Sequence, residues 1–266
     1  MQQAALLLSS LLLATAAAAE PADQVTAPPA PPEGVGLGYQ FEASIATTYV
    51  FRGVPQYGRL SDPSSQNTAA LRLDRLGPGA LTLTLWNATS VANFQQNSTT
   101  ALEFDLSASY GMDLGAGFSA SVGYTAYLYP EHAANLPYDG AHEIQLGVSW
   151  ANEWVTPSLL VALEVARLRG AYASLGLSRD LNAGPLVITP AFSLGIAGYN
   201  DYLLSGHPAD PHLNDLSASV GVKLPFSDVF YAALRFNGAY RATPESVSGS
   251  IDRFSGLVAF AIGAAR

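Results

Sequence analysis

The residues best suited to chemistry are charged side chains that recur at every second position within otherwise apolar or small-residue stretches. Glu103 and Asp105 flank Phe104, for example, and Lys223 stands between Val222 and Leu224. Because successive side chains of a β-strand point to opposite faces, charges spaced in this way would share one face of a sheet. Nine residues meet this description: Glu42, Arg52, Arg72, Glu103, Asp105, Glu143, Glu164, Lys223 and Arg235.

Two roles fit such a face, and the sequence leaves both open. Charged side chains that line a water-filled passage set its ion selectivity. Alternatively, the mixed signs pair across a closed space and form a structural salt-bridge network. Most of the other positions on this face are Ser, Gly, Thr or Ala, which leaves room for water. We therefore expect the nine residues to be pore-lining, and the slight acidic excess favours a weak preference for cations.

Other chemistry has little support in the sequence. The chain has no Cys, so disulfides, thiolate metal sites and cysteine nucleophiles are excluded. His132, His142, His207 and His212 lie in or beside expected connections and match no metal-binding spacing. His142 beside Glu143 is the candidate for a Ser–His pair, but neither GxSxG nor HExxH accompanies it. We expect no cofactor, no metal and no enzyme activity.

The element that positions Glu103 and Asp105 is an expected β-hairpin over residues 101–129. Leu, Phe, Ala, Tyr and Met occupy the even positions from 102 to 112, and polar residues occupy most of the odd ones. Alternation resumes from 118 to 128, after a turn whose glycines permit positive φ. Soluble strands average about 5–6 residues, whereas a tilted strand needs about 9–11 to cross a bilayer. The hairpin therefore indicates membrane-crossing strands.

The same unit recurs along the chain, and we count twelve such segments from residue 37 onward. Their connections alternate between long polar loops and short turns, apart from a brief connection at 167–170. An even number of strands with this alternation is typical of bacterial outer-membrane barrels. The predicted fold is therefore all-β, a transmembrane antiparallel up-and-down barrel of about twelve strands, with both termini on the short-turn side.

Two finer expectations concern side-chain orientation. The first segment is predicted to run from Leu37 to Arg52, with Tyr49 and Phe51 among its lipid-facing residues. Aromatic residues near segment ends are expected to form girdles at the membrane interfaces. These residues are Tyr39, Tyr49, Trp86, Tyr110, Tyr129, Trp150, Trp154, Tyr199 and Tyr240.

Composition agrees with this architecture. Charged residues make up 12% of the chain, about half of the usual share in a soluble domain, while hydrophobic residues reach 49%. The formal net charge of −9 argues against nucleic acid as a partner. Residues 1–19 resemble a secretory signal, although no Lys or Arg precedes the apolar run. Residues 20–36 are predicted to form a Pro-rich periplasmic linker, and residues 37–266 to form the barrel.

Residues 47–56, TTYVFRGVPQ, resemble the start of the TorF-type porins of proteobacteria. The matching residues are Tyr49, Phe51, Arg52, Gly53, Val54 and Gln56, and Pro55 stands where Ser is usual. The resemblance implies a barrel with channel function. We interpret Arg52 as lying at the rim of the lumen and Gly53 as releasing the strand into the first loop. The chain departs from outer-membrane barrels in ending FAIGAAR rather than in an aromatic residue.

These observations predict an outer-membrane, porin-like channel for passive diffusion of small hydrophilic solutes or ions. The alternative is a non-conducting structural or adhesive barrel that binds partners through its external loops; a lipid-acting barrel enzyme is a further one. The expected partners are outer-membrane lipid, the barrel assembly machinery and the diffusing solutes or ions. No feature of the sequence indicates a subunit interface.

Overall fold

The computed structural model describes residues 36–52, 54–55, 63–91, 102–129, 140–166, 170–198, 211–242 and 253–266. The expected signal segment and linker lie outside these residues, apart from Gly36. In the described residues, no helix is long and apolar enough to cross a membrane.

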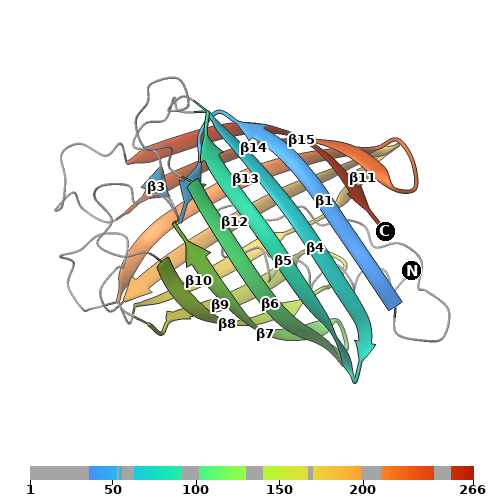
Figure 1. Ribbon diagram of the computed structural model, residues 1–266, viewed down its shortest axis with the longest axis horizontal. Helices are drawn as coiled ribbons and strands as arrows, with labels where there is room; N and C mark the ends of the chain where they lie inside the picture. The colour runs from blue at the N-terminus through green and yellow to red at the C-terminus, as the bar shows by residue number, and fades with distance from the viewer. Residues whose placement is uncertain are drawn as a thin grey trace.

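Twelve antiparallel strands form a closed barrel in the part of the chain that the structure describes (Figure 1). Each strand pairs with its neighbours in chain order, and β1 closes the ring against β15 from Gln40↔Ala265 to Ala46↔Ala259. The strands are β1 (Gly36–Ala46), β4 (Ser64–Leu76), β5 (Gly79–Ser90), β6 (Leu102–Gly115), β7 (Phe118–Leu128), β8 (Gly140–Trp150), β9 (Thr156–Glu164), β10 (Ala171–Ser178), β12 (Leu186–Gly198), β13 (His212–Pro225), β14 (Phe230–Arg241) and β15 (Phe254–Ala265).

Three short strands complete the set. β11 (Leu181–Ala183) pairs with the start of β12 beyond the end of β10, so it extends one edge rather than adding a strand to the ring. β2 (Val50–Phe51) and β3 (Val54–Pro55) pair only with each other. The predicted up-and-down barrel of about twelve strands is therefore confirmed.

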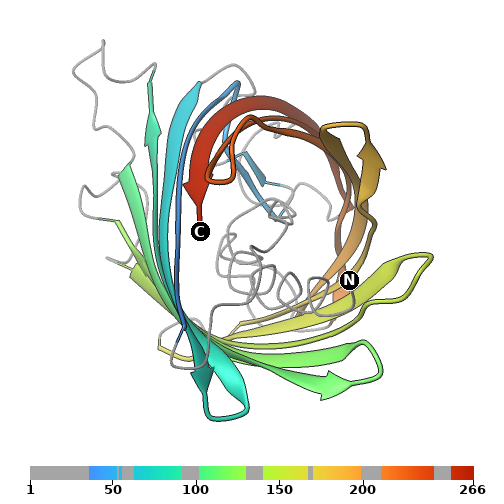
Figure 2. The ribbon, with the colours of Figure 1, turned by 90° about the vertical axis from the view of Figure 1, so that its right-hand side faces the viewer.

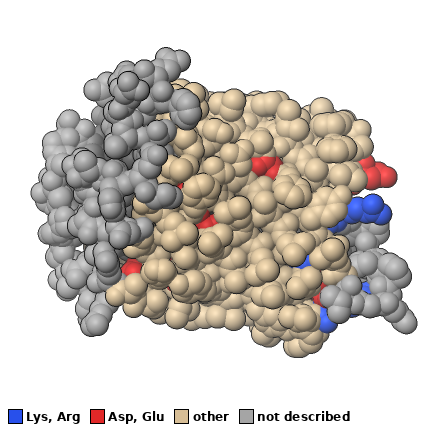
Figure 3. Space-filling view, viewed as in Figure 1, with Lys and Arg blue, Asp and Glu red and all other residues tan. Residues whose placement is uncertain are grey.

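The wall has the polarity that a bilayer requires. In β15 exposed and buried residues alternate from Phe254 to Gly263, and the exposed positions include Val258, Phe260 and Ile262. The buried positions face the lumen and, apart from Leu257, carry small side chains. A soluble sheet would bury its apolar face, whereas here the apolar face is the exposed one. Figure 3 shows that the outer wall in this view is almost free of charge, with charged residues concentrated toward the end where the turns lie.

The connections separate the two ends of the barrel. Two-residue turns join β4 to β5 and β6 to β7, while the connections after β1, β5, β7, β12 and β14 are each more than ten residues long. In the β6–β7 turn the predicted glycines have positive φ, +84° at Gly115 and +83° at Gly117. β1 begins and β15 ends at the short-turn end (Figure 1), where Tyr39 and Arg266 exchange backbone hydrogen bonds of 2.9 and 3.0 Å.

The first predicted segment is wrong at its end. β1 stops at Ala46 rather than continuing to Arg52, and the chain turns at Thr47, whose Oγ1 accepts a hydrogen bond from the Val258 amide. The strands β2 and β3 then pair as the β2–β3 hairpin, which lies inside the ring of strands (Figure 2). Tyr49 and Phe51 are consequently 1% and 4% exposed instead of facing lipid.

Candidate functional site: a lumen crossed by the β2–β3 hairpin

All nine predicted pore-lining residues lie on the inner side of the barrel, in two groups. Four occupy the half nearer the short turns, and we call them the turn-end group: Glu42, Arg72, Lys223 and Arg235. Five lie nearer the long connections, and we call them the loop-end group: Arg52, Glu103, Asp105, Glu143 and Glu164. Every member of the loop-end group is buried.

The turn-end group joins three strands around one carboxylate. Arg235 on β14 donates from Nη2 to Oε2 of Glu42 on β1 at 2.7 Å, and the Tyr231 hydroxyl donates to the same oxygen at 2.9 Å. The Lys223 ammonium lies 4.0 Å from the centre of the Tyr231 ring, a cation–π arrangement. Gly263 on β15 leaves the space that this ring fills. Arg72 pairs separately with Asp74 on β4, at 2.6 Å.

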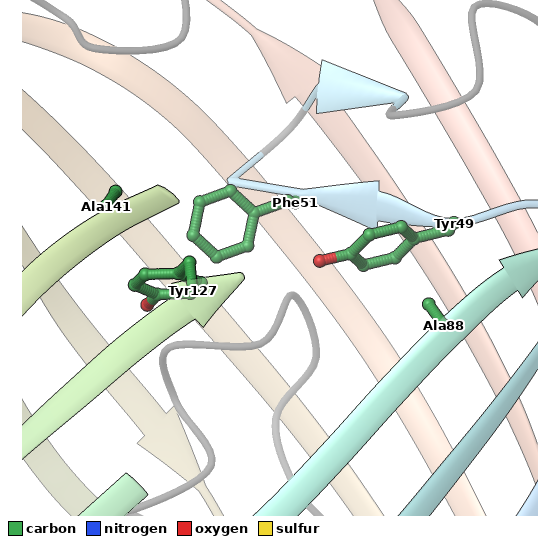
Figure 4. Close-up of a cluster of buried hydrophobic side chains, with 5 residues drawn as sticks. All are labelled: Tyr49, Phe51, Ala88, Tyr127 and Ala141. Carbon is green, nitrogen blue, oxygen red and sulfur yellow. The ribbon is translucent and has the colours of Figure 1, made fainter. Parts of the chain in front are cut away.

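The β2–β3 hairpin anchors itself on opposite walls of the lumen. Tyr49 packs against Trp86 on β5, with ring centres 5.2 Å apart, and Phe51 packs edge-on to Tyr127 on β7 at 5.9 Å. Figure 4 shows the rings of Tyr49, Phe51 and Tyr127 with Ala88 and Ala141, whose short side chains leave room for them. On the other side, Val50 clusters with Ala46, Ala239, Leu257 and Ala259, which belong to β1, β14 and β15. The hairpin therefore bridges the lumen.

Arg52, at the hairpin tip, is the centre of the loop-end group. Its Nη1 and Nη2 donate to the two oxygens of Glu143 at 2.9 and 3.0 Å, a bidentate pair. The guanidinium lies 4.2 Å from the Tyr172 ring centre and 4.7 Å from that of Phe51. Asn214 donates from Nδ2 to the Arg52 carbonyl at 3.1 Å. Arg52 thus contacts β8, β10 and β13 close to the ends of these strands that lie on the side of the long connections.

Glu143 lies opposite Glu164 across the β8–β9 pair, an arrangement in which like charges repel. Both carboxylates are buried, and Glu143 is fully so. Glu143 is offset by Arg52 and accepts a further hydrogen bond from the Tyr127 hydroxyl at 2.9 Å. Glu164 accepts the amides of His142 and Ala166 at 3.3 and 3.0 Å. The arginine therefore stabilises a pair of acids that would otherwise destabilise the wall.

Glu103 and Asp105 have a different environment. Glu103 accepts a hydrogen bond of 3.3 Å from the Tyr129 hydroxyl. Asp105 is 3% exposed, and neither of its carboxylate oxygens has a hydrogen-bond partner among the described residues. Among these residues, β6 therefore presents two buried carboxylates without a cationic partner.

Several lumen residues near the ends of the predicted segments were missed. Tyr172, Asp215 and Arg241 are buried on the inner face. Tyr172 and Asp215 lie at the starts of predicted segments and Arg241 directly follows one, and none of the three was counted as pore-lining. The Tyr172 hydroxyl donates to Asp215 Oδ1 at 3.2 Å, as does Asn214 Nδ2 at 2.8 Å. Tyr172, Asp215 and Arg241 keep the strand alternation of Ser174, Ser217 and Arg235, respectively. Following that alternation for two residues, or for six in the case of Arg241, would have placed them in the lumen.

The aromatic girdle prediction holds in part. Tyr39, Trp150, Trp154 and Tyr240 are exposed on the outside. Tyr49, Trp86 and Tyr129 were assigned wrongly, because they pack within the lumen around the hairpin. Tyr199 lies outside the described residues. The physical reason is that the Tyr49 and Phe51 side chains find small partners, Ala88 and Ala141, on the inner wall.

The histidines offer no catalytic or metal arrangement in the described part of the chain. His142 lies on the outer side of β8, and its Nδ1 is 2.6 Å from the Tyr124 hydroxyl, so its ring points away from the face that carries Glu143. His132 and His207 lie outside the described residues. Within the described residues, no group of three or more His, Asp or Glu could hold a metal ion.

An apolar exterior, a polar interior and an even number of antiparallel strands define the fold of an outer-membrane β-barrel. The chain belongs to the Gcw_chp family, described as a bacterial protein of unknown function, whose model matches residues 33–223. A comparison with curated proteins found no match.

The solved structures that share the fold include a porin and an outer-membrane channel. The NanC porin is 8% identical, with a TM-score of 0.52, and the match covers 85% of this chain and 98% of that one. An outer membrane channel from Pseudomonas putida F1 is 9% identical, with a TM-score of 0.50, and the match covers 90% of this chain and 100% of that one. At this level of identity the likeness establishes the fold alone.

Proposed function

We propose that the protein is an outer-membrane channel that passes small hydrophilic solutes or ions by diffusion, and that the β2–β3 hairpin narrows its lumen. The observation that carries this proposal is the inner wall itself. It holds ionisable groups at both ends, with a hairpin between opposite walls that reduces the free cross-section without belonging to the wall. Charged groups beside a constriction are what an ion-selective passage requires.

The location and maturation of the protein form part of the same proposal. The exposed outer face of the strands consists mostly of large apolar side chains, which suits outer-membrane lipid as its surroundings. Residues 1–19 would direct export, residues 20–36 would remain as a periplasmic linker, and the barrel assembly machinery would insert the chain. The resemblance to TorF-type porins and the two channels that share the fold support this assignment. We propose no enzyme activity, since His142 faces outward against Tyr124.

The Arg52 contacts also favour a second candidate. A hairpin tip held by Glu143, Tyr172 and Asn214 could close the lumen, leaving a structural or adhesive barrel that acts through its external loops. The two candidates differ in one measurable property, the passage of ions.

Conductance of the refolded chain from residue 20 to 266 in a planar bilayer separates them. We expect discrete single-channel steps and, under a KCl gradient, a reversal potential with a weak preference for potassium, because acids outnumber bases in the lumen. Circular dichroism and heat-dependent gel mobility establish that the barrel is folded. A folded barrel that produces no steps would contradict the channel and support the structural candidate.

The turn-end group provides a prediction about selectivity. Glu42→Gln removes the carboxylate that Arg235 and Tyr231 bind, so Arg235 and Lys223 leave a net positive charge at this level. The potassium-to-chloride permeability ratio, measured from the reversal potential, is expected to fall about twofold or more. Tyr231→Phe removes a contact to the same carboxylate without changing charge and is the matched control. Equal shifts in both variants would show that packing, not charge, sets the ratio.

A further inference from the structure

The loop-end half of the lumen contains a feature that the proposed channel does not by itself explain. Glu103 and Asp105 lie two residues apart on the inner face of β6, and they are 6% and 3% exposed. Burying a carboxylate is costly unless a cation or several hydrogen bonds compensate it. Glu103 has the 3.3 Å contact from Tyr129, and Asp105 has no hydrogen-bond partner among the described residues.

Nearby charges add to the cost rather than reduce it. Glu103 lies two positions from Asp105 on the same face of β6, so its like charge does not compensate the Asp105 carboxylate. Arg52, the cation of the loop-end group, directs both of its terminal nitrogens to Glu143. A site with this electrostatic character attracts a mobile cation.

The walls of this site are aromatic. In the strand register, Asp105 is flanked by Trp86 on β5 and by Tyr127 on β7. Tyr49, directly before the hairpin, packs against Trp86, and Tyr129 reaches Glu103 from the end of β7. Ring faces attract cations that shed their water easily, above all alkylammonium groups, and two carboxylates supply the countercharge. A divalent metal would instead require several oxygen ligands, and no three-residue cluster of metal ligands occurs in the described chain.

We propose that Glu103 and Asp105, together with the rings of Trp86 and Tyr49, form a binding site for an organic ammonium ion inside the lumen. This inference rests on the proposed channel, because it assigns the class of solute that pauses at the constriction. Asp105 supplies the countercharge, Glu103 a second carboxylate and Trp86 a ring face. Tyr49 lies in the segment between β1 and β2 rather than in a wall strand.

Trp86 provides a direct reporter of binding. The chain has three tryptophans, and Trp150 and Trp154 are exposed on the outside, so Trp150→Phe with Trp154→Phe leaves Trp86 as the single emitter. Tetramethylammonium chloride, titrated into this refolded protein at constant ionic strength, is expected to change Trp86 fluorescence saturably. Potassium chloride, the matched salt, is expected to produce no saturable change. An equal response to both salts, or none to tetramethylammonium, would overturn the site.

Variants test the assigned residues. Asp105→Asn is expected to weaken tetramethylammonium binding about tenfold or more, since one charge–charge contact is lost. Asp228→Asn removes the same charge from an exposed turn and should leave binding unchanged. Unchanged affinity in Asp105→Asn, or an equal loss in both variants, would contradict the proposal.

The melting temperature of Asp105→Asn gives an independent check. It shows whether the variant folds and whether the Asp105 carboxylate serves binding rather than stability. Asp105→Asn removes a buried charge that has no described partner, so its melting temperature should be no lower than that of the parent protein. A clear fall would mean that Asp105 stabilises the barrel and would overturn its role as a ligand-binding group.

The binding site and the channel can fail separately. Tetramethylammonium binding without single-channel conductance would retain the site and reject the channel, whereas conductance without binding would reject the site and retain the channel.

Discussion

Releasing the β2–β3 hairpin from the wall is expected to raise the single-channel conductance several-fold. Replacing Tyr49 and Phe51 with Ser removes two side chains that are 1% and 4% exposed and that pack against Trp86, Tyr127 and Ala141. Holding the hairpin in one conformation costs conformational entropy, and these packing contacts compensate that cost. Without them the hairpin no longer stays across the lumen, and the constriction is lost. Planar-bilayer recordings at fixed salt measure the effect.

The control for this change uses another pair of aromatic side chains. Phe226 and Phe230 stack on each other at 6.3 Å on the outside of the barrel, near the short turns. Replacing both with Ser alters the same number of rings without touching the lumen, so conductance should stay at the parental value. If the hairpin variant also conducts like the parent, the hairpin does not set the constriction, and the proposed narrowing is wrong.

Arg52→Ala is expected to lower the free energy of unfolding by about 3 kcal/mol, within the range for breaking a buried ion pair. The reason is Glu143, which is 0% exposed and would lose its bidentate partner while still facing Glu164 across the strand pair. Urea unfolding of the refolded barrel in detergent, followed by tryptophan fluorescence, measures the difference. Arg52→Lys keeps the charge but loses the fork geometry and the ring stacking, so an intermediate loss is expected.

A double-mutant cycle separates this pairing from general packing at the hairpin tip. Glu143→Gln alone removes the repulsion with Glu164 but leaves the guanidinium without its carboxylate. Arg52→Met combined with Glu143→Leu replaces the pair by apolar side chains of similar size and should recover most of the stability. Arg52→Met and Glu143→Leu are therefore also measured singly. If these two single losses simply add in the double variant, the pair is not coupled, and the stabilisation must come from the other contacts of Arg52.

The alternation of residue types determined much of the architecture by itself. A strand has two faces, so residues two apart share one, and Glu103 with Asp105 or Lys223 could be placed in the lumen without any structure. The same rule, combined with the alternation of turns and long loops, predicted twelve strands and the end at which the termini meet. These features are local, because each depends on neighbours within about ten residues.

The tertiary structure decided where the alternation stops and which side chains meet. Tyr49 and Phe51 continue the apolar pattern of β1, yet they face the lumen because Ala88 and Ala141 leave space for them there. Arg52 meets Glu143, 91 positions away, only because the chain turns inward at Thr47. An apolar ring is stabilised equally by lipid and by a protein interior, so its sequence position cannot distinguish the two. The choice depends on long-range contacts, and those exist only once the barrel has closed.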